Sequence, residues 1–162
     1  MANFAITNST VSGGGGTQQS VATTPKTLLA TYGSTTSPTR GKVYDLLIGT
    51  NGTPADNTTE WDIPRTTGTS SGGTTATPQA LDPADAAATS LITVNSTTEG
   101  TITANSDLFY VGINQRASYR WVAAPGSELV WPATSCNGLV LRVKSASGYT
   151  GTATGSWLFQ EQ

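Results

Sequence analysis

Residues 139–144 read LVLRVK, and their side chains divide between two faces in strict alternation. Leu139, Leu141 and Val143 share one face, whereas Val140, Arg142 and Lys144 share the other. A period of two is typical of a β-strand with one face on a hydrophobic core. The stretch therefore predicts a strand whose Leu139, Leu141 and Val143 side chains are buried.

The same period recurs along the chain. In Val43–Ile48 the residues Leu46 and Ile48 share the predicted core face, and in Ala117–Ala123 the residues Tyr119 and Trp121 do. The nearly uniform apolar run at Leu108–Ile113 predicts a central strand. Weaker strands are expected at Lys26–Tyr32, Glu60–Thr66, Leu91–Asn95 and Thr150–Phe159. About eight strands with long loops in the first half predict an all-β fold, an antiparallel β-sandwich of the single jelly-roll type.

One short helix is expected at Asp82–Thr89. Asp82 is a favourable N-cap, Pro83 suits the first helical position, and the alanines that follow favour helix. Residues 1–25 contain the glycine run 13–16 among Ser, Thr and Gln, which predicts a flexible N-terminal arm with no core to join. Residues 26–162 then form a single domain.

Composition argues against most catalytic chemistry. The chain has 30 threonines and 16 serines but no histidine and one cysteine, which excludes Ser-His-Asp and Cys-His catalysis and His-containing zinc sites. A single cysteine, Cys136, also excludes an intrachain disulfide. The paired carboxylates Glu60 and Asp62 do not by their sequence proximity make a glycosidase site. We predict a structural or binding protein that is not an enzyme and has no cofactor or metal.

The charge is small and unevenly placed. A net charge of −2 argues against nucleic acid as a partner. No apolar run is long enough for a membrane span, and residues 1–10 lack the regions of a signal peptide, so we expect the chain to be made in the cytosol. Residues 45–107 carry −7, whereas 116–144 carry +3. These segments are either ordinary solvated surface or complementary patches between subunits.

The four tryptophans divide into two pairs. Trp121 and Trp157 lie in alternating strands and are expected in the core. Trp61 lies in a polar run and Trp131 precedes a proline, so both are expected at an edge or an interface. There they could contact a partner protein or stack on a sugar.

Two long stretches of the chain resemble a known family. Residues 44–65 read YDLLIGTNGTPADNTTEWDIPR, followed by ALDPADAAA at 80–88, and residues 113–130 read INQRASYRWVAAPGSELV. They resemble small virion proteins of tailed bacteriophages, including cyanophages, that act as capsid decoration or cement proteins. The resemblance covers about half of the chain. It implies a jelly-roll-like domain, a homotrimer, and binding to the major capsid protein on the outer capsid surface.

The predicted function is therefore a structural virion protein that stabilises a phage head from outside. The alternative is a carbohydrate-binding module or a tail-fibre or receptor-binding domain. Contacts are expected from the N-terminal arm and from a hairpin tip that presents Asn114, Gln115 and Arg116, because arginine is favoured at interfaces. Trp61 and Trp131 complete the predicted interface residues.

Overall fold

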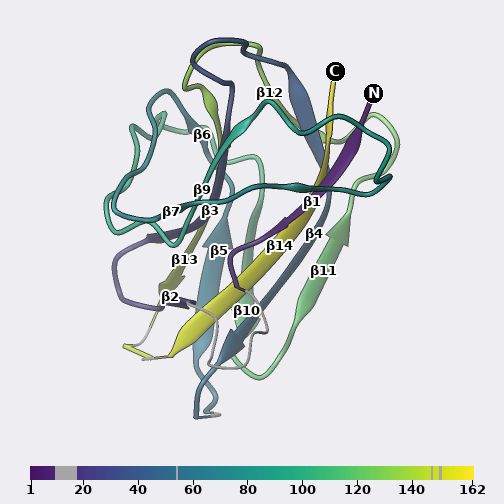
Figure 1. Ribbon diagram of the computed structural model, residues 1–162. Coiled ribbons are helices and arrows are strands. Elements are labelled where there is room, and N and C mark those ends of the chain that lie inside the picture. The colour runs from purple at the N-terminus through teal and green to yellow at the C-terminus, as the bar shows by residue number, and fades with distance from the viewer. Residues whose placement is uncertain (10–17, 54, 147, 150) are drawn as a thin grey trace.

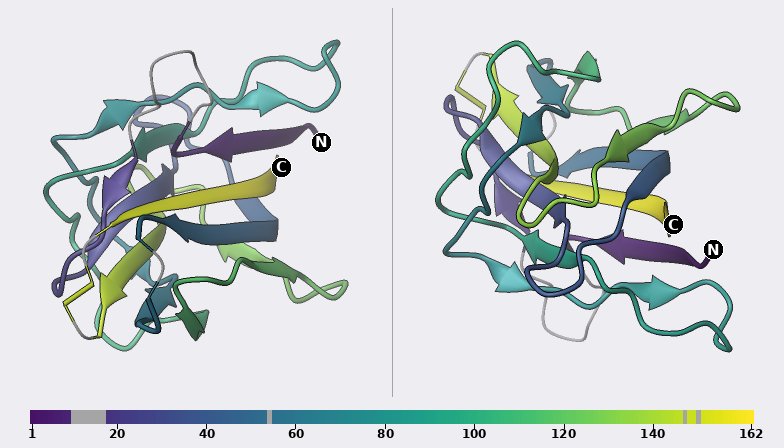
Figure 2. Two further views of the ribbon diagram at one scale, coloured as in Figure 1. Left: turned by 90° about the horizontal axis from the view of Figure 1, so that it is seen from below. Right: turned by 90° about the horizontal axis from the view of Figure 1, so that it is seen from above.

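The computed structural model describes residues 1–9, 18–53, 55–146, 148–149 and 151–162. Two seven-stranded antiparallel sheets pack as a β-sandwich (Figure 1). β1 and β14, the first and last strands, pair with each other, so both ends of the chain lie together (Figure 2). Within the described ranges the chain forms strands and turns but no helix.

Sheet A has the strand order β11-β4-β14-β1-β8. These strands are β11 (Tyr119–Val122), β4 (Gly41–Asn51), β14 (Thr152–Glu161), β1 (Asn3–Thr7) and β8 (Gln79–Ala80). Two short strands extend the sheet, β12 (Leu129–Trp131) beside β4 and β2 (Gln19–Ser20) beside β14.

Sheet B has the strand order β10-β5-β13-β3-β9-β7. These strands are β10 (Tyr110–Asn114), β5 (Thr58–Asp62), β13 (Gly138–Ser145), β3 (Lys26–Tyr32), β9 (Leu91–Val94) and β7 (Thr74–Thr75). The two-residue strand β6 (Arg65–Thr66) pairs with one end of β13.

The core lies between the sheets and follows the alternation of the sequence. The predicted core residues that the structure buries are Leu46, Ile48, Leu139, Leu141, Val143 and Trp157. Tyr119 and Trp121 depart from this prediction: Tyr119 is exposed and Trp121 half-buried. Both point towards Phe109, but β11 is the edge strand of sheet A, so no further strand covers them.

One end of sheet B is covered on its outer face as well. Ala30, Tyr32 and Val140 form a second apolar cluster there, contacted by Leu91 and Ile102. The Tyr32 hydroxyl donates a hydrogen bond to Ser70 Oγ at 2.9 Å. This bond holds the segment around Ser70 against the outer face of sheet B. The other end of this face, over β5 and β13, carries the charged pairs Asp62 with Arg142 and Glu60 with Lys144, of which the Lys144 side chain is the most exposed, at 43%.

Two predicted elements are wrong. The run at Leu108–Ile113 forms the edge strand β10 rather than a central strand, with Tyr110 exposed. The predicted helix at Asp82–Thr89 is a turn, in which Asp82 Oδ1 accepts a hydrogen bond from the Ala84 N–H at 2.9 Å. This loop projects from the body of the sandwich (Figure 2), and residues 81–87 are all exposed. A short helix needs a packed face, which this loop cannot supply.

The prediction of an N-terminal arm without a core to join is wrong for residues 1–9 and 18–25. β1 pairs with both β14 and β8, and its Phe4 and Ile6 side chains are buried in the main core. Gln19 and Val21 are buried too. The alternation Phe4, Ile6 is a strand signal that the neighbouring glycine run obscured. That glycine run, 13–16, lies outside the described residues.

Candidate interaction surface

The outward side chains of sheet A form one face of the molecule, which we call the sheet A face. Because side chains alternate along a strand, residues opposite one another on paired strands share a face. One row runs across five strands and a second row across four. The members of the two rows are Gln79, Ala5, Leu158, Asp45 and Val122, and Thr7, Ser156, Leu47 and Arg120.

The sheet A face is apolar for a surface that nothing covers in the part of the chain that the structure describes. Leu47 is 48% exposed and Val122 is 57% exposed. Three adjoining hollows lie along this face, one between β1, β14 and residues 76–79, one beside Asp45 and Arg120, and one around Gly49 and Thr154. Exposed apolar side chains gathered on one face are a feature of protein association sites.

Polar and apolar side chains are mixed in these rows, and the two charged members form an ion pair. Arg120 binds Asp45 through two hydrogen bonds, Nε to Oδ1 at 3.0 Å and Nη2 to Oδ2 at 2.6 Å. The hydrogen bonds from Arg120 hold the pKa of Asp45 below its ordinary value, although burial opposes them. Asp45 is therefore ionised at neutral pH and its charge is matched in place. A partner that covers this face meets no unpaired charge in these rows.

Other charged side chains also pair within the chain. Besides Asp45 with Arg120, three pairs join the acidic segment to the basic one: Asp56 with Arg116, Glu60 with Lys144, and Asp62 with Arg142. Strand pairing explains this pattern, because β4 and β5 from the acidic segment lie beside β11 and β13 from the basic segment. The interpretation that the two segments meet between subunits therefore loses its basis.

The predicted hairpin tip at Asn114–Arg116 is a crossover between the sheets. β10 before it belongs to sheet B and β11 after it to sheet A, so the prediction of a hairpin is wrong. Gln115 is buried, and its side-chain amide donates a hydrogen bond to the Thr53 carbonyl at 2.7 Å. It therefore ties the crossover to Thr53, just after the end of β4. Asn114 and Arg116 are exposed beside it and remain available for contact.

Trp61 and Trp131 are buried, so their predicted place at an edge or interface is wrong. Trp61 is 1% exposed and donates a hydrogen bond from Nε1 to Thr59 Oγ1 at 3.0 Å. Trp131 is fully buried, with its ring edge against Phe159 at 5.6 Å between centroids. The alternation in the sequence could have predicted the burial of both tryptophans. Trp61 lies two residues after the buried Thr59, and Trp131 lies two residues after the buried Leu129.

Leu47 and Val122 are the surface residues that sequence reasoning missed. Each follows an inward apolar residue directly, as in Leu46-Leu47 and Trp121-Val122. Since adjacent residues of a strand face opposite ways, one member of each apolar pair must point outward. Two consecutive apolar residues in an otherwise alternating strand were therefore the available signal.

Comparison of the chain with protein-family models, curated proteins and solved structures gives no match. Over the described ranges, the structure contains no helix that could span a membrane. In the same residues, no cluster of three or more Cys, Asp or Glu side chains is placed to hold a metal ion.

Proposed function

We propose that this protein is a capsid decoration protein of a tailed bacteriophage, which binds the outside of the shell through the sheet A face. The observation that carries the proposal is the pairing of two strands that are far apart in the sequence. The two long stretches that resemble decoration proteins, 44–65 and 113–130, supply most of β4 and the whole of β11, and these two strands pair side by side. Their outward side chains Leu47, Arg120 and Val122 belong to one surface.

Strand order supports the finer assignment of a jelly roll. We set aside β9 and the five strands of two or three residues, β2, β6, β7, β8 and β12. The remaining eight strands are ordered β1-β14-β4-β11 in sheet A and β3-β13-β5-β10 in sheet B. Numbered along the chain from one to eight, these strands read 1-8-3-6 and 2-7-4-5. Successive strands thus cross between the layers except at β5 and β10, which are neighbours in sheet B. This order is that of two Greek keys, and viral capsid domains are among the proteins built this way.

Stabilisation of the shell follows from burial of the sheet A face on capsid protein. Covering Leu47, Val122 and Leu158 removes apolar surface from water. The ion pair of Asp45 and Arg120 can fix the orientation of the capsid protein on this face, and it leaves no unpaired charge in the contact. The proposal includes a homotrimer, because several weak contacts then act together on neighbouring capsid subunits. Asn114 and Arg116 lie at one end of β11 and extend the contact.

The test adds purified protein to phage shells that lack it and follows DNA release on heating. We expect wild type to bind and to raise the release temperature. Leu47→Glu should lose both effects, because it places a new charge in the contact. The matched control is Leu81→Glu, since Leu81 is 52% exposed on the projecting loop and should tolerate the charge.

Two results would contradict the proposal at different levels. If wild-type protein neither binds shells nor shifts the release temperature, the decoration function is wrong. If wild type binds and Leu47→Glu binds equally well with an unchanged melting temperature, the function stands but the sheet A face is not the contact. The earlier alternative of sugar stacking on Trp61 and Trp131 has no support, because both rings are buried.

A further inference from the structure

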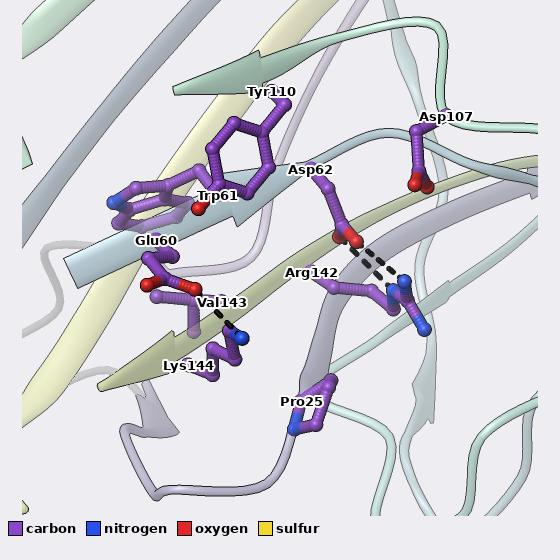
Figure 3. Close-up of a pocket in the computed structure, with 9 residues that line it drawn as sticks. All are labelled: Pro25, Glu60, Trp61, Asp62, Asp107, Tyr110, Arg142, Val143 and Lys144. Atoms are coloured by element: carbon purple, nitrogen blue, oxygen red, sulfur yellow. Dashed lines mark hydrogen bonds and ion pairs between the residues drawn. The ribbon is translucent and has the colours of Figure 1, made fainter. Parts of the chain in front are cut away.

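A second accessible site lies on the opposite side of the sandwich, on the outer face of sheet B. Three neighbouring strands build it in register: Tyr110 of β10 lies opposite Asp62 of β5, and Asp62 lies opposite Arg142 of β13. Two residues further along β13, Lys144 lies opposite Glu60 of β5. Pro25 and Asp107, from two loops, complete the rim of a hollow over these strands (Figure 3).

The charged groups of this hollow are held in place by one another. Lys144 Nζ lies 2.7 Å from Glu60 Oε2, and Arg142 binds both carboxylate oxygens of Asp62. Lys144 lowers the pKa of Glu60 and Glu60 raises the pKa of Lys144, so both are ionised at neutral pH. Because the pairs fix the side chains before any ligand arrives, binding would lose little side-chain entropy.

The hollow presents hydrogen-bond donors beside hydrogen-bond acceptors. Each carboxylate oxygen can accept more than one hydrogen bond, and Lys144 can donate three. Lys144 is 43% exposed on its side chain, so its remaining N–H groups reach solvent. A hydroxyl group both donates and accepts, which makes a polyol ring a natural match for such an array.

Tyr110 adds an aromatic face to this array. Tyr110 is 62% exposed although it belongs to a strand of the sandwich. Figure 3 shows it on the same side of the sheet as Glu60 and Asp62. An exposed tyrosine presents an apolar ring with a polar tip, which suits a ligand that has both an apolar and a hydroxylated side.

We propose that this hollow binds a neutral saccharide, with one pyranose ring stacked on Tyr110 and its hydroxyls bound by Glu60, Lys144 and Asp62. This activity goes beyond shell binding and uses the opposite side of the molecule. The charges set the ligand class. Glu60, Asp62 and Asp107 against Arg142 and Lys144 leave a charge of −1, so the hollow favours a neutral ring over an anionic one.

The test uses an array of neutral oligosaccharides of glucose, galactose, mannose and N-acetylhexosamines, with sialylated and sulfated glycans beside them. The best neutral ligand is then titrated by calorimetry. We expect Tyr110→Ala to weaken binding at least tenfold and Tyr110→Phe to stay within about threefold, because the ring persists. Lys144→Ala should weaken binding several-fold. The control is Leu108→Ala, also exposed but outside the hollow.

Three outcomes would overturn the proposal. The first is no neutral saccharide bound at millimolar concentration by folded protein. The second is binding that Tyr110→Ala leaves unchanged, with circular dichroism confirming the fold of the variant. The third is binding restricted to sialylated or sulfated glycans, which would assign an anionic ligand. None of these results depends on shells, so the outcome is independent of the decoration function.

Discussion

Two glycines of β4 have opposite structural roles. A Cβ atom built on Gly41 would lie 2.1 Å from a ring carbon of Trp131, whereas one on Gly49 finds its nearest atom, Thr154 Oγ1, at 3.7 Å. Trp131 is fully buried, so its ring has no room to withdraw. Gly41 is therefore needed for the packing of β12 on β4, and Gly49 is not.

Gly41→Ala should lower the free energy of unfolding by about 1–3 kcal/mol, the usual range for overpacking a core. Gly49→Ala should change it by less than about 0.5 kcal/mol, as surface substitutions do. Urea unfolding followed by tryptophan fluorescence measures both. Equal stability of the two variants would show that the Trp131 ring does not rest on Gly41.

Asp45 predicts a specific pH dependence of stability. Hydrogen bonds from Arg120 lower its folded pKa below the unfolded value near 4. A lowered carboxyl pKa stabilises the fold above the unfolded pKa, and this stabilisation is lost as pH falls through the folded pKa. Asp45→Asn cannot ionise, so it should be less stable than wild type at pH 7 and approach it below about pH 4.

The expected difference at pH 7 is at most about 1 kcal/mol, because the Arg120 partner lies largely in solvent. Denaturant unfolding of both proteins at pH 7, 5 and 3 measures it. A difference that stays constant across this range would mean that the charge of Asp45 contributes nothing and that only its shape matters.

At the scale of elements, β1 shows that the N-terminal segment belongs to the fold. Phe4 is buried and stacks on Phe159 with ring centroids 5.3 Å apart. Phe4→Ala should therefore cost about 3–5 kcal/mol, the range for deleting a buried phenyl ring. Met1→Ala, at a position 86% exposed, is the control and should be neutral. A Phe4→Ala variant with wild-type melting temperature would mean that β1 detaches without consequence.

The alternation at 139–144 correctly predicted a strand, and this stretch lies inside β13. Lys26–Tyr32, expected as a weaker strand, is β3 to the residue, although its residues from Thr27 onward are buried on both faces and do not alternate. Apolar content alone misled at Leu108–Ile113, where the run lies at an edge. Helix propensity misled at 82–89, because an exposed loop gives a helix nothing to pack against.

The candidate sites were less predictable than the strands. Which sheet a strand joins depends on its pairing with strands that are distant in the sequence. The sequence therefore predicted a hairpin at Asn114–Arg116, where the structure has a crossover between the sheets. The sheet A face needs β4 and β11 side by side, although about 70 residues separate them in the sequence. The hollow at Tyr110 likewise needs three strands from separate parts of the chain.

At the scale of the whole molecule, charge pairing within the chain decides how copies should associate. Four acidic residues of the 45–107 segment already bind bases of the 116–144 segment, so few ionic contacts are left for a neighbour. The proposed homotrimer should then rest on apolar burial, which salt does not screen. We expect sedimentation velocity to give a trimer at micromolar concentration in both 0.05 M and 0.5 M NaCl, with dissociation constants within about threefold. A trimer that dissociates at the higher salt would mean that ion pairs hold the subunits together. The acidic segment 45–107 and the basic segment 116–144 would then meet between subunits. A monomer at both salts would remove the homotrimer, and shell binding would then rest on single copies of the sheet A face.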